Sequence, residues 1–238
     1  MRLFHGTSGK AVSKILEQGI QPRRRTKKTN WDNAPSHPNA IYLTTCYAGY
    51  FAHCAVKRST LLGMVEIDTD KLYEAFLRPD EDFLEQAFRE GGNRINKPLR
   101  DTLKGKDMLE CTAWFREHLD EFSHVWRASV DNIGNCCYMG RIAPEAITRA
   151  VTFDYKLNSE IGLEFLNPTI TLANYKFCSQ RYKALTAWLF GDPVQVEDFL
   201  APMPALESLD GEMKVMYEQR IAHWKELITN RSGITVLK

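Results

Sequence analysis

Short hydrophobic runs alternate along the chain with stretches whose apolar residues recur at helical spacing. The runs are rich in β-branched and aromatic residues, which predicts strands at 2–5, 40–44, 62–67, 136–142 and 147–153. Helical spacing predicts helices at about 11–19, 47–57, 174–190 and 206–228, and the charged segment at about 80–128 is also helical in pattern. Strands distributed among helices predict an α+β fold.

The same pattern divides the chain into two parts. Residues 1–155 hold the predicted strands, with a helical insertion at about 80–128, and residues 156–238 form a helical C-terminal extension packed on this core. We expect the apolar face of the last helix to lie in the core, although it could also dock a partner. That face carries Leu206, Leu209, Met213, Met216, Tyr217, Trp224 and Leu227.

Composition narrows the class of protein. The 238 residues are 44% hydrophobic and 26% charged, as in ordinary globular proteins and unlike disordered chains or disulfide mini-proteins. No stretch approaches the roughly 20 apolar residues that span a bilayer, and the first residues lack the apolar segment of a signal peptide. We therefore expect a cytoplasmic protein with no membrane partner. The six cysteines form no CxxC pair, so no metal site is expected.

Polar and aromatic residues follow a specific order across the first third of the chain. The order is His5-Gly6-Thr7, a helix closing on Gly19-Ile20, a strand with Tyr42 and Thr44, and a helix with Tyr50. A lone histidine at a strand end is commonly a core residue, so the ordered set carries the signal. It resembles the His–Tyr branch of the ADP-ribosyltransferase superfamily over about residues 2–72, with a weaker likeness at 135–153. That branch holds poly(ADP-ribose) polymerases, the diphtheria-toxin group and, more distantly, RNA 2′-phosphotransferases and DNA-targeting toxins.

The resemblance implies an ADP-ribosyltransferase-like split β-sandwich core and transfer of single ADP-ribose units from NAD. Such an enzyme holds the nicotinamide amide, stacks on its flat ring and stabilises positive charge on the ribose. The implied roles follow the family motif residue by residue. His5 binds the adenosine ribose, Gly6 presents its backbone to the amide with Thr7 beside it, Tyr42 and Tyr50 stack on the ring, and Thr44 and Tyr47 add hydroxyl contacts.

The third motif of the family departs from its pattern here. Many members place a glutamate at the start of a late strand, and counting back from the turn at 142–147 gives Asn135, within one residue. Asparagine carries no charge and is no base, which disfavours chain elongation but permits single transfer. Glu110, Asp131 and Glu145 are carboxylates that the fold could deliver instead, although each is expected to be a solvated surface charge.

One basic loop breaks a near-perfect charge balance. The chain has 31 basic and 30 acidic residues, yet five basic residues fall within 22–31, namely Arg23, Arg24, Arg25, Lys27 and Lys28, beside Trp31. The resemblance makes this the loop that covers NAD, where arginines could clamp the pyrophosphate. The same composition suits a single nucleic-acid strand, with Trp31 stacking on a base, or simply a solvated loop.

Several functions therefore remain open. The first is a mono-ADP-ribosyltransferase whose acceptor is RNA or DNA, slightly favoured over protein, and which by family analogy acts as a bacterial toxin or phage-defence factor. The others are an RNA 2′-phosphotransferase-like enzyme, for which Arg2 and Arg141 are a partial match, and an inactive module that binds NAD or ADP-ribose. An antitoxin or regulatory protein could bind the C-terminal helices in any of these cases.

Overall fold

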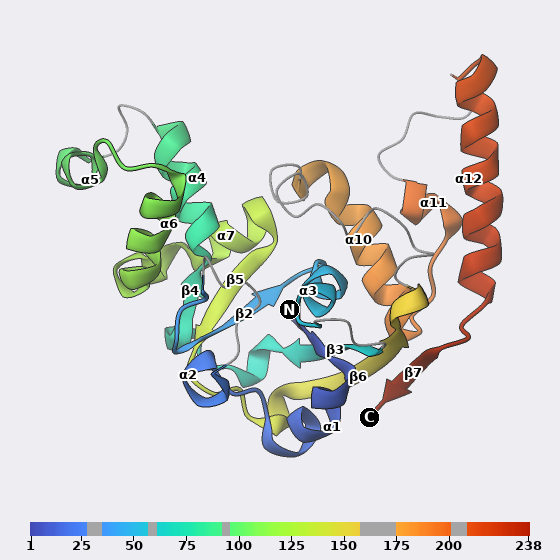
Figure 1. Cartoon of the computed structure of the whole chain (residues 1–238), viewed down its shortest axis with the longest axis horizontal. Helices are drawn as coiled ribbons and strands as arrows, with labels where there is room; N and C mark the ends of the chain where they lie inside the picture. The colour runs from blue at the N-terminus through green and yellow to red at the C-terminus, as the bar shows by residue number, and fades with distance from the viewer. Residues whose placement is uncertain (28–34, 57–60, 92–95, 158–174, 201–208) are drawn as a thin grey trace.

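The computed structural model describes residues 1–27, 35–56, 61–91, 96–157, 175–200 and 209–238, without the side chains of 176–178 and 200. Its strands form one antiparallel sheet with the order β4-β5-β2-β1-β3-β6-β7, whose two edges do not meet to close a barrel (Figure 1). The strands are β1 (Arg2–Ser8), β2 (Ala40–Thr44), β3 (Leu61–Asp68), β4 (Leu77–Pro79), β5 (Asn135–Met139), β6 (Ile147–Asp154) and β7 (Ile234–Leu237). The α+β prediction is confirmed.

The helices gather in separate groups around this sheet. Figure 1 shows α4, α5 and α6 over one end of it and α10, α11 and α12 over the other, with α3 between the two groups. The α-helices are α1 (Gly9–Gln18), α2 (Arg23–Thr26), α3 (Ala48–Cys54), α4 (Glu81–Gly91), α5 (Lys97–Leu103), α6 (Met108–Glu117), α7 (Trp126–Ile133), α10 (Tyr175–Phe190), α11 (Val196–Leu200) and α12 (Gly211–Thr229). Short 3₁₀ turns are η1 (Thr69–Lys71), η2 (Glu74–Phe76), η4 (Leu119–Val125) and η5 (Pro144–Ala146).

Three apolar clusters hold these groups to the sheet. The first joins α3 and the C-terminal helices to β3 and β6, with Trp188 and Trp224 among its largest buried side chains. The second packs α1 against the opposite face through Val12 and Ile15. The third joins the insertion to β2 and β5 around Phe115. Alternate residues of a strand point to opposite faces of the sheet. One face of β2 therefore packs in the second cluster, and its other face packs in the third.

The sheet is almost divided in two between β1 and β2. These strands share one residue pair, Phe4 with Thr44, whereas β1 pairs with β3 along its whole length from Arg2 to Ser8. A single residue pair therefore joins the lobe β4-β5-β2 to the lobe β1-β3-β6-β7, and β1 beyond Phe4 has no described pairing with β2.

Three features differ from the pattern-based predictions. The first strand continues past residue 5 to Ser8, so His5 lies within it. The C-terminal part is not purely helical, because β7 adds a strand beside β6. In α12 the predicted apolar face is split: Tyr217, Trp224 and Leu227 are buried, whereas Met213 and Met216 are exposed. Lys28, Trp31 and Leu206 lie outside the described residues. None of the described helices combines the length and hydropathy needed to cross a bilayer.

Candidate functional site

His5 bridges the point where the two lobes separate. Its Nδ1 lies 2.9 Å from the backbone carbonyl oxygen of Tyr42. A carbonyl can only accept, so Nδ1 carries the proton and, in the neutral ring, Nε2 is left as an acceptor. Burial lowers the pKa of His5, and the hydrogen bond to the Tyr42 carbonyl only partly opposes this. The ring is therefore neutral at pH 7 and presents a lone pair.

Gly6 follows on the same edge of β1, and its lack of a side chain has a clear packing reason. A Cβ at Gly6 would collide with the carbonyl oxygen of Ala48 and the backbone nitrogen of Ala52, both in α3. Glycine thus lets α3 pack directly on the backbone of β1. Antiparallel continuation of the Phe4–Thr44 register would set Gly6 beside Tyr42, but the described ladder contains no such pair.

Tyr42 is held by the insertion rather than left free. Its phenol donates to the carboxylate of Glu81, at 2.8 Å from Oε1 and 2.7 Å from Oε2, and accepts from the backbone N–H of His37 at 3.2 Å. Arg116 of α6 donates from Nε to the same Oε1 at 2.8 Å. Burial and the Glu81 charge raise the pKa of Tyr42 well above its ordinary value. The phenol is therefore a fixed proton donor, and its ring position is set by α4 and α6.

Asn135 begins β5 directly opposite Thr44, on the face of the sheet that also carries Tyr42. Its side chain is only 2% exposed, and its Oδ1 is a buried polar atom that has no hydrogen-bond partner among the described residues. The backbone is well satisfied in contrast, since the Ser129 hydroxyl donates to the Asn135 carbonyl at 2.8 Å. A buried acceptor without a donor costs free energy, so its retention points to a ligand or a water at this place.

Three expected contact residues have structural roles instead. Thr44 is fully buried, and its Oγ1 accepts from the N–H groups of Cys46 and Tyr47, which starts the turn into α3. The ring of Tyr47 packs edge-on against Tyr175 and Tyr182 of α10 and is 1% exposed. Tyr50 is also in the core. All three side chains are buried in this structure, and the hydroxyl contacts expected of Thr44 and Tyr47 and the stacking expected of Tyr50 stay predictions.

The arginines of the basic loop differ in their surroundings. The Nε of Arg23 donates to the carbonyl of Ser36 at 2.9 Å, which ties α2 to the stretch before β2. Arg24 and Arg25 are exposed and line a surface hollow together with Arg141, which follows β5. Sequence spacing alone did not group Arg141 with the loop.

Glu81 is the site residue that the sequence did not single out. It lies in the acidic run 80–82, whose composition is typical of a helix N-terminus, and Asp80 does cap α4, because its Oδ1 accepts from the Asp82 N–H at 2.9 Å. Glu81, one residue later, turns inward to Tyr42. The three carboxylates named as substitutes stay outside: Glu110 closes the capping box of α6, and Asp131 and Glu145 are exposed.

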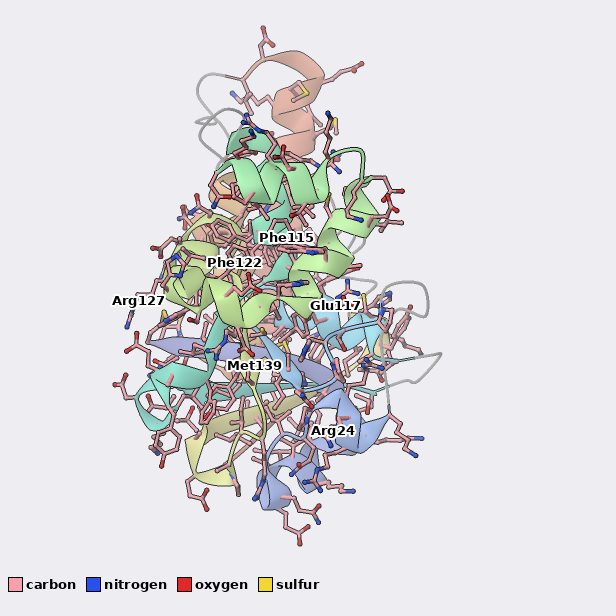
Figure 2. All side chains as sticks on the ribbon, turned by 90° about the vertical axis from the view of Figure 1, so that its left-hand side faces the viewer. Arg24, Phe115, Glu117, Phe122, Arg127 and Met139 are labelled. Atoms are coloured by element: carbon pink, nitrogen blue, oxygen red, sulfur yellow. The ribbon has the colours of Figure 1, made fainter. Side chains whose placement is uncertain are left out.

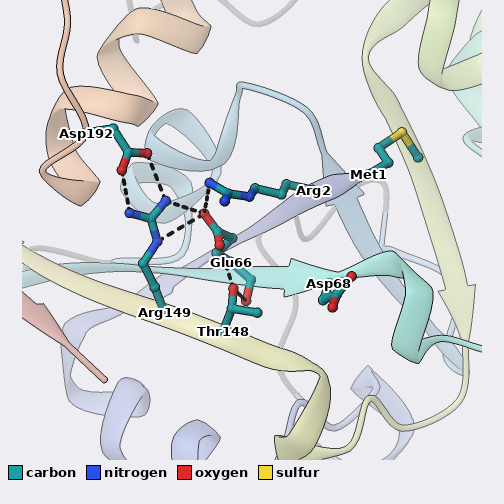
Figure 3. A pocket seen from close by; sticks show the side chains of 7 residues that line it. All are labelled: Met1, Arg2, Glu66, Asp68, Thr148, Arg149 and Asp192. Atoms are coloured by element: carbon teal, nitrogen blue, oxygen red, sulfur yellow. Dashed lines mark hydrogen bonds and ion pairs between the residues drawn. The ribbon is translucent and has the colours of Figure 1, made fainter.

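A second polar cluster lies apart from this site, around buried Glu66 of β3 (Figure 3). Arg149 of β6 donates to Glu66 and also pairs with Asp192 after α10, at 2.6 and 2.8 Å. The Thr148 hydroxyl donates to the same glutamate, and Arg2 lies 3.6 Å from it. Each arginine of this cluster lies against a carboxylate, so the cluster is an ion-pair network that joins β1, β3 and β6 to the C-terminal helices. Neither this hollow nor the one beside Arg141 includes His5, Tyr42 or Asn135.

Comparison with known proteins adds little to this geometry. No protein-family model matches the chain, and no curated protein matches it. The chain is similar to a solved structure described as "EcPltA", with 14% identity and a TM-score of 0.35, over 66% of this chain and 79% of that one. A similarity of this size carries no argument about function.

Proposed function

We propose that the chain is a mono-ADP-ribosyltransferase that takes NAD as its co-substrate. The observation that carries the proposal is the β1–β2 opening, by which we mean the point where the two strands stop pairing after Phe4 and Thr44. There neutral His5 bonds to the Tyr42 backbone and Gly6 follows it on β1. Asn135, opposite Thr44 on β5, has a buried oxygen without a donor among the described residues. The acceptor of the ADP-ribose is a macromolecule, with RNA or DNA slightly favoured over protein.

Each of these groups can make a specific contact with NAD in the protonation state and conformation that it has in the structure. The free Nε2 of His5 accepts a hydrogen bond from a ribose hydroxyl. The edge of Gly6 that faces β2 offers backbone N–H and C=O to a primary amide, the group that nicotinamide carries. The ring of Tyr42 provides a flat surface for the nicotinamide ring, and its bond to Glu81 keeps that surface in one orientation.

Asn135 takes the position nearest to the developing charge. The bond between C1′ of the ribose and the nicotinamide nitrogen breaks, and both electrons leave with nicotinamide, which becomes neutral. Positive charge then develops at C1′, where the negative end of the Asn135 amide dipole stabilises it while Oδ1 accepts from a ribose hydroxyl. A lone pair of the acceptor forms the new bond to C1′, and the acceptor's proton passes to water. Asn135 supplies no carboxylate to activate a ribose hydroxyl of the attached unit as the next acceptor, which disfavours chain elongation and favours the transfer of a single unit.

A binding module without turnover is the second candidate, and one observation favours it. The buried carboxylate of Glu81 is already engaged by Arg116 and the phenol of Tyr42, so it is not free to act as a base. An RNA 2′-phosphotransferase has no comparable support, since Arg2 lies against Glu66 and Arg141 donates to the carbonyl of Gln18.

The test uses NAD labelled in its adenylate phosphate, incubated separately with RNA, DNA and protein. We expect label on one pool and an equal amount of free nicotinamide. His5→Ala and Tyr42→Ala should each reduce transfer about 100-fold or more. His124→Ala and Tyr73→Ala, which change an exposed histidine and an exposed tyrosine, should leave it unchanged.

The outcomes separate the candidates. NAD binding measured by calorimetry without release of nicotinamide supports the binding module. Full transfer by both His5→Ala and Tyr42→Ala overturns the site assignment, and absence of NAD binding by the parent protein overturns the proposal altogether.

A further inference from the structure

A hollow of about 560 Å³ opens where β5 ends and α2 begins, away from the β1–β2 opening. We call it the arginine hollow. It is lined by Gln21, Pro22, Arg24, Arg25, Asn39, Gly140 and Arg141. Figure 2 labels Arg24 on α2 and Met139, the last residue of β5. We propose that the arginine hollow binds the phosphate backbone of a single-stranded nucleic acid.

The charge of the arginine hollow is uncompensated within the described part of the chain. Among those residues, three guanidinium groups line the hollow and no carboxylate does. Among the ion pairs formed by the described residues, none includes Arg24, Arg25 or Arg141. The hollow around Glu66 is the opposite case, because its arginines pair with Glu66 and Asp192, and Asp68 lines it as well. Like charges held together without counter-charge create a local positive potential that attracts an anion, even in a chain of net charge +1.

The arginine hollow is built from anchored backbone. Arg141 donates from Nε and Nη2 to the carbonyl of Gln18, at 3.1 and 2.9 Å, and this leaves Nη1 for a ligand. The N–H of Arg24 donates to the carbonyl of Pro38 at 2.6 Å, and the N–H of Gly140 donates to the carbonyl of Asn39 at the same distance. Segments distant in sequence are thus fixed side by side, so less conformational entropy is lost when an anion binds.

The distance between the arginine hollow and the β1–β2 opening limits which anion fits. Asn135 pairs with Thr44, whereas Met139 pairs with Ala40, four residues further along both strands. That separation is about 13 Å at 3.3 Å per residue. The pyrophosphate of NAD is joined to its reacting ribose carbon by only a few bonds, so we expect NAD bound at the β1–β2 opening to leave its pyrophosphate short of the arginine hollow. A polymer whose nucleotide reaches that opening carries further phosphates over such a distance.

The neighbours of the arginines favour a nucleic acid over an acidic peptide. Two amide side chains, Gln21 and Asn39, line the same hollow. Amides pair with base edges, and arginines match phosphates through their forked geometry. Bases are open to such contacts in a single strand. This inference deepens the proposed function, because what it says about the choice of acceptor rests on that function. Binding of the nucleic acid itself does not depend on NAD.

The experiment measures fluorescence anisotropy of labelled single-stranded RNA and DNA oligonucleotides without NAD. The main variant is Arg24→Gln with Arg25→Gln, both exposed, and Arg141→Gln is made separately. The matched control is Lys214→Gln with Lys225→Gln, two exposed lysines of α12 that remove the same charge. Circular dichroism checks that each variant is folded.

We expect the double arginine variant to bind at least about tenfold more weakly at low salt, with the control unchanged. Each lost phosphate contact should also flatten the salt dependence, by about 0.7 in the slope of log K against log salt for a single strand. Affinity for NAD, measured separately, should be unaffected. Arg141→Gln should weaken binding as well.

Four results overturn the inference: no binding of either oligonucleotide by the parent, equal binding by the arginine variants, an equal loss of NAD affinity, or equally effective competition by polyglutamate. The third result assigns the arginine hollow to the NAD pyrophosphate, and the fourth to an acidic peptide. If the parent protein binds the oligonucleotides but does not bind NAD, the proposed function is rejected and this inference stands.

Discussion

Removal of the Glu81 carboxylate tests whether the insertion holds Tyr42 in place. Glu81 is 5% exposed and accepts hydrogen bonds from the Tyr42 phenol and from Arg116, whose side chain is 15% exposed. Glu81→Ala leaves a guanidinium and a phenol without their acceptor in a mostly dry place. Hydrogen bonds to charged groups contribute about 1.5–3 kcal/mol each, and loss of one partner of a buried ion pair costs about 3–5 kcal/mol.

We expect the lower end of that range, about 3 kcal/mol, because Arg116 keeps some access to water. For a chain of this length the loss corresponds to a decrease in Tm of about 6–12 °C. The assay is urea unfolding followed by circular dichroism, with an unchanged m-value. Glu81→Gln retains one accepting oxygen and should lose about half as much. Glu90→Ala, an exposed change in the same helix, should stay within about 0.5 kcal/mol of the parent.

A double-mutant cycle isolates the bond to Tyr42. Tyr42→Phe removes only the hydroxyl, so its cost should shrink once Glu81 is already alanine. If the two losses add within about 0.5 kcal/mol, the phenol and the carboxylate do not interact. A loss below about 1 kcal/mol for Glu81→Ala alone would also refute the reasoning, since it would mean that Arg116 and Tyr42 are satisfied by water.

Three further predictions rest on other parts of the site and the sheet. Burial lowers the pKa of His5 in the folded state below its unfolded value of about 6.5, so the free energy of unfolding falls as the pH drops from 6.5 toward the folded pKa. His5→Gln should weaken this pH dependence between about pH 7 and 5, and an unchanged pH profile of the variant would contradict the prediction. Gly6→Ala should cost at least about 1–3 kcal/mol in urea unfolding, because its Cβ meets the backbone of α3, and a neutral result would show that α3 can shift. Arg149→Leu should destabilise the protein more than Glu66→Gln, since it strands the carboxylate of Glu66 without its main donor, and equal Tm values in thermal melts would argue against the network.

Local pattern was sufficient for the elements that decide the fold class. The strand at 40–44 was predicted with its observed bounds, and the helix ending before Gly19 closes there because that glycine adopts a φ of 74°. The strand at 234–237 was missed, since four residues at the chain end carry little periodic signal and are ordered by pairing with β6. Local pattern describes what a segment prefers, and an edge strand depends on its neighbour.

The site was harder to predict because its contacts join distant segments. Asn135 was placed at the start of a strand by counting from a turn, and it does begin β5. The contact of Tyr42 with Glu81 spans 39 positions and follows from the pairing of β4 with β5, which no periodicity encodes. Tyr47 resembles a contact residue in sequence but is buried by Tyr182 of α10, far along the chain.

Both helical parts of the chain converge on the strand ends that flank Asn135. On one side, α4 and α6 fix Tyr42 through Glu81. On the other, the hydroxyl of Tyr175 in α10 lies 3.0 Å from the Thr45 hydroxyl, just after β2. The N–H of Thr45 donates to the carbonyl of Gly134, the residue before Asn135, at 2.7 Å. The geometry around Asn135 therefore depends on the insertion and on the C-terminal helices together, so a partner that displaced α10 would act on the site without touching it.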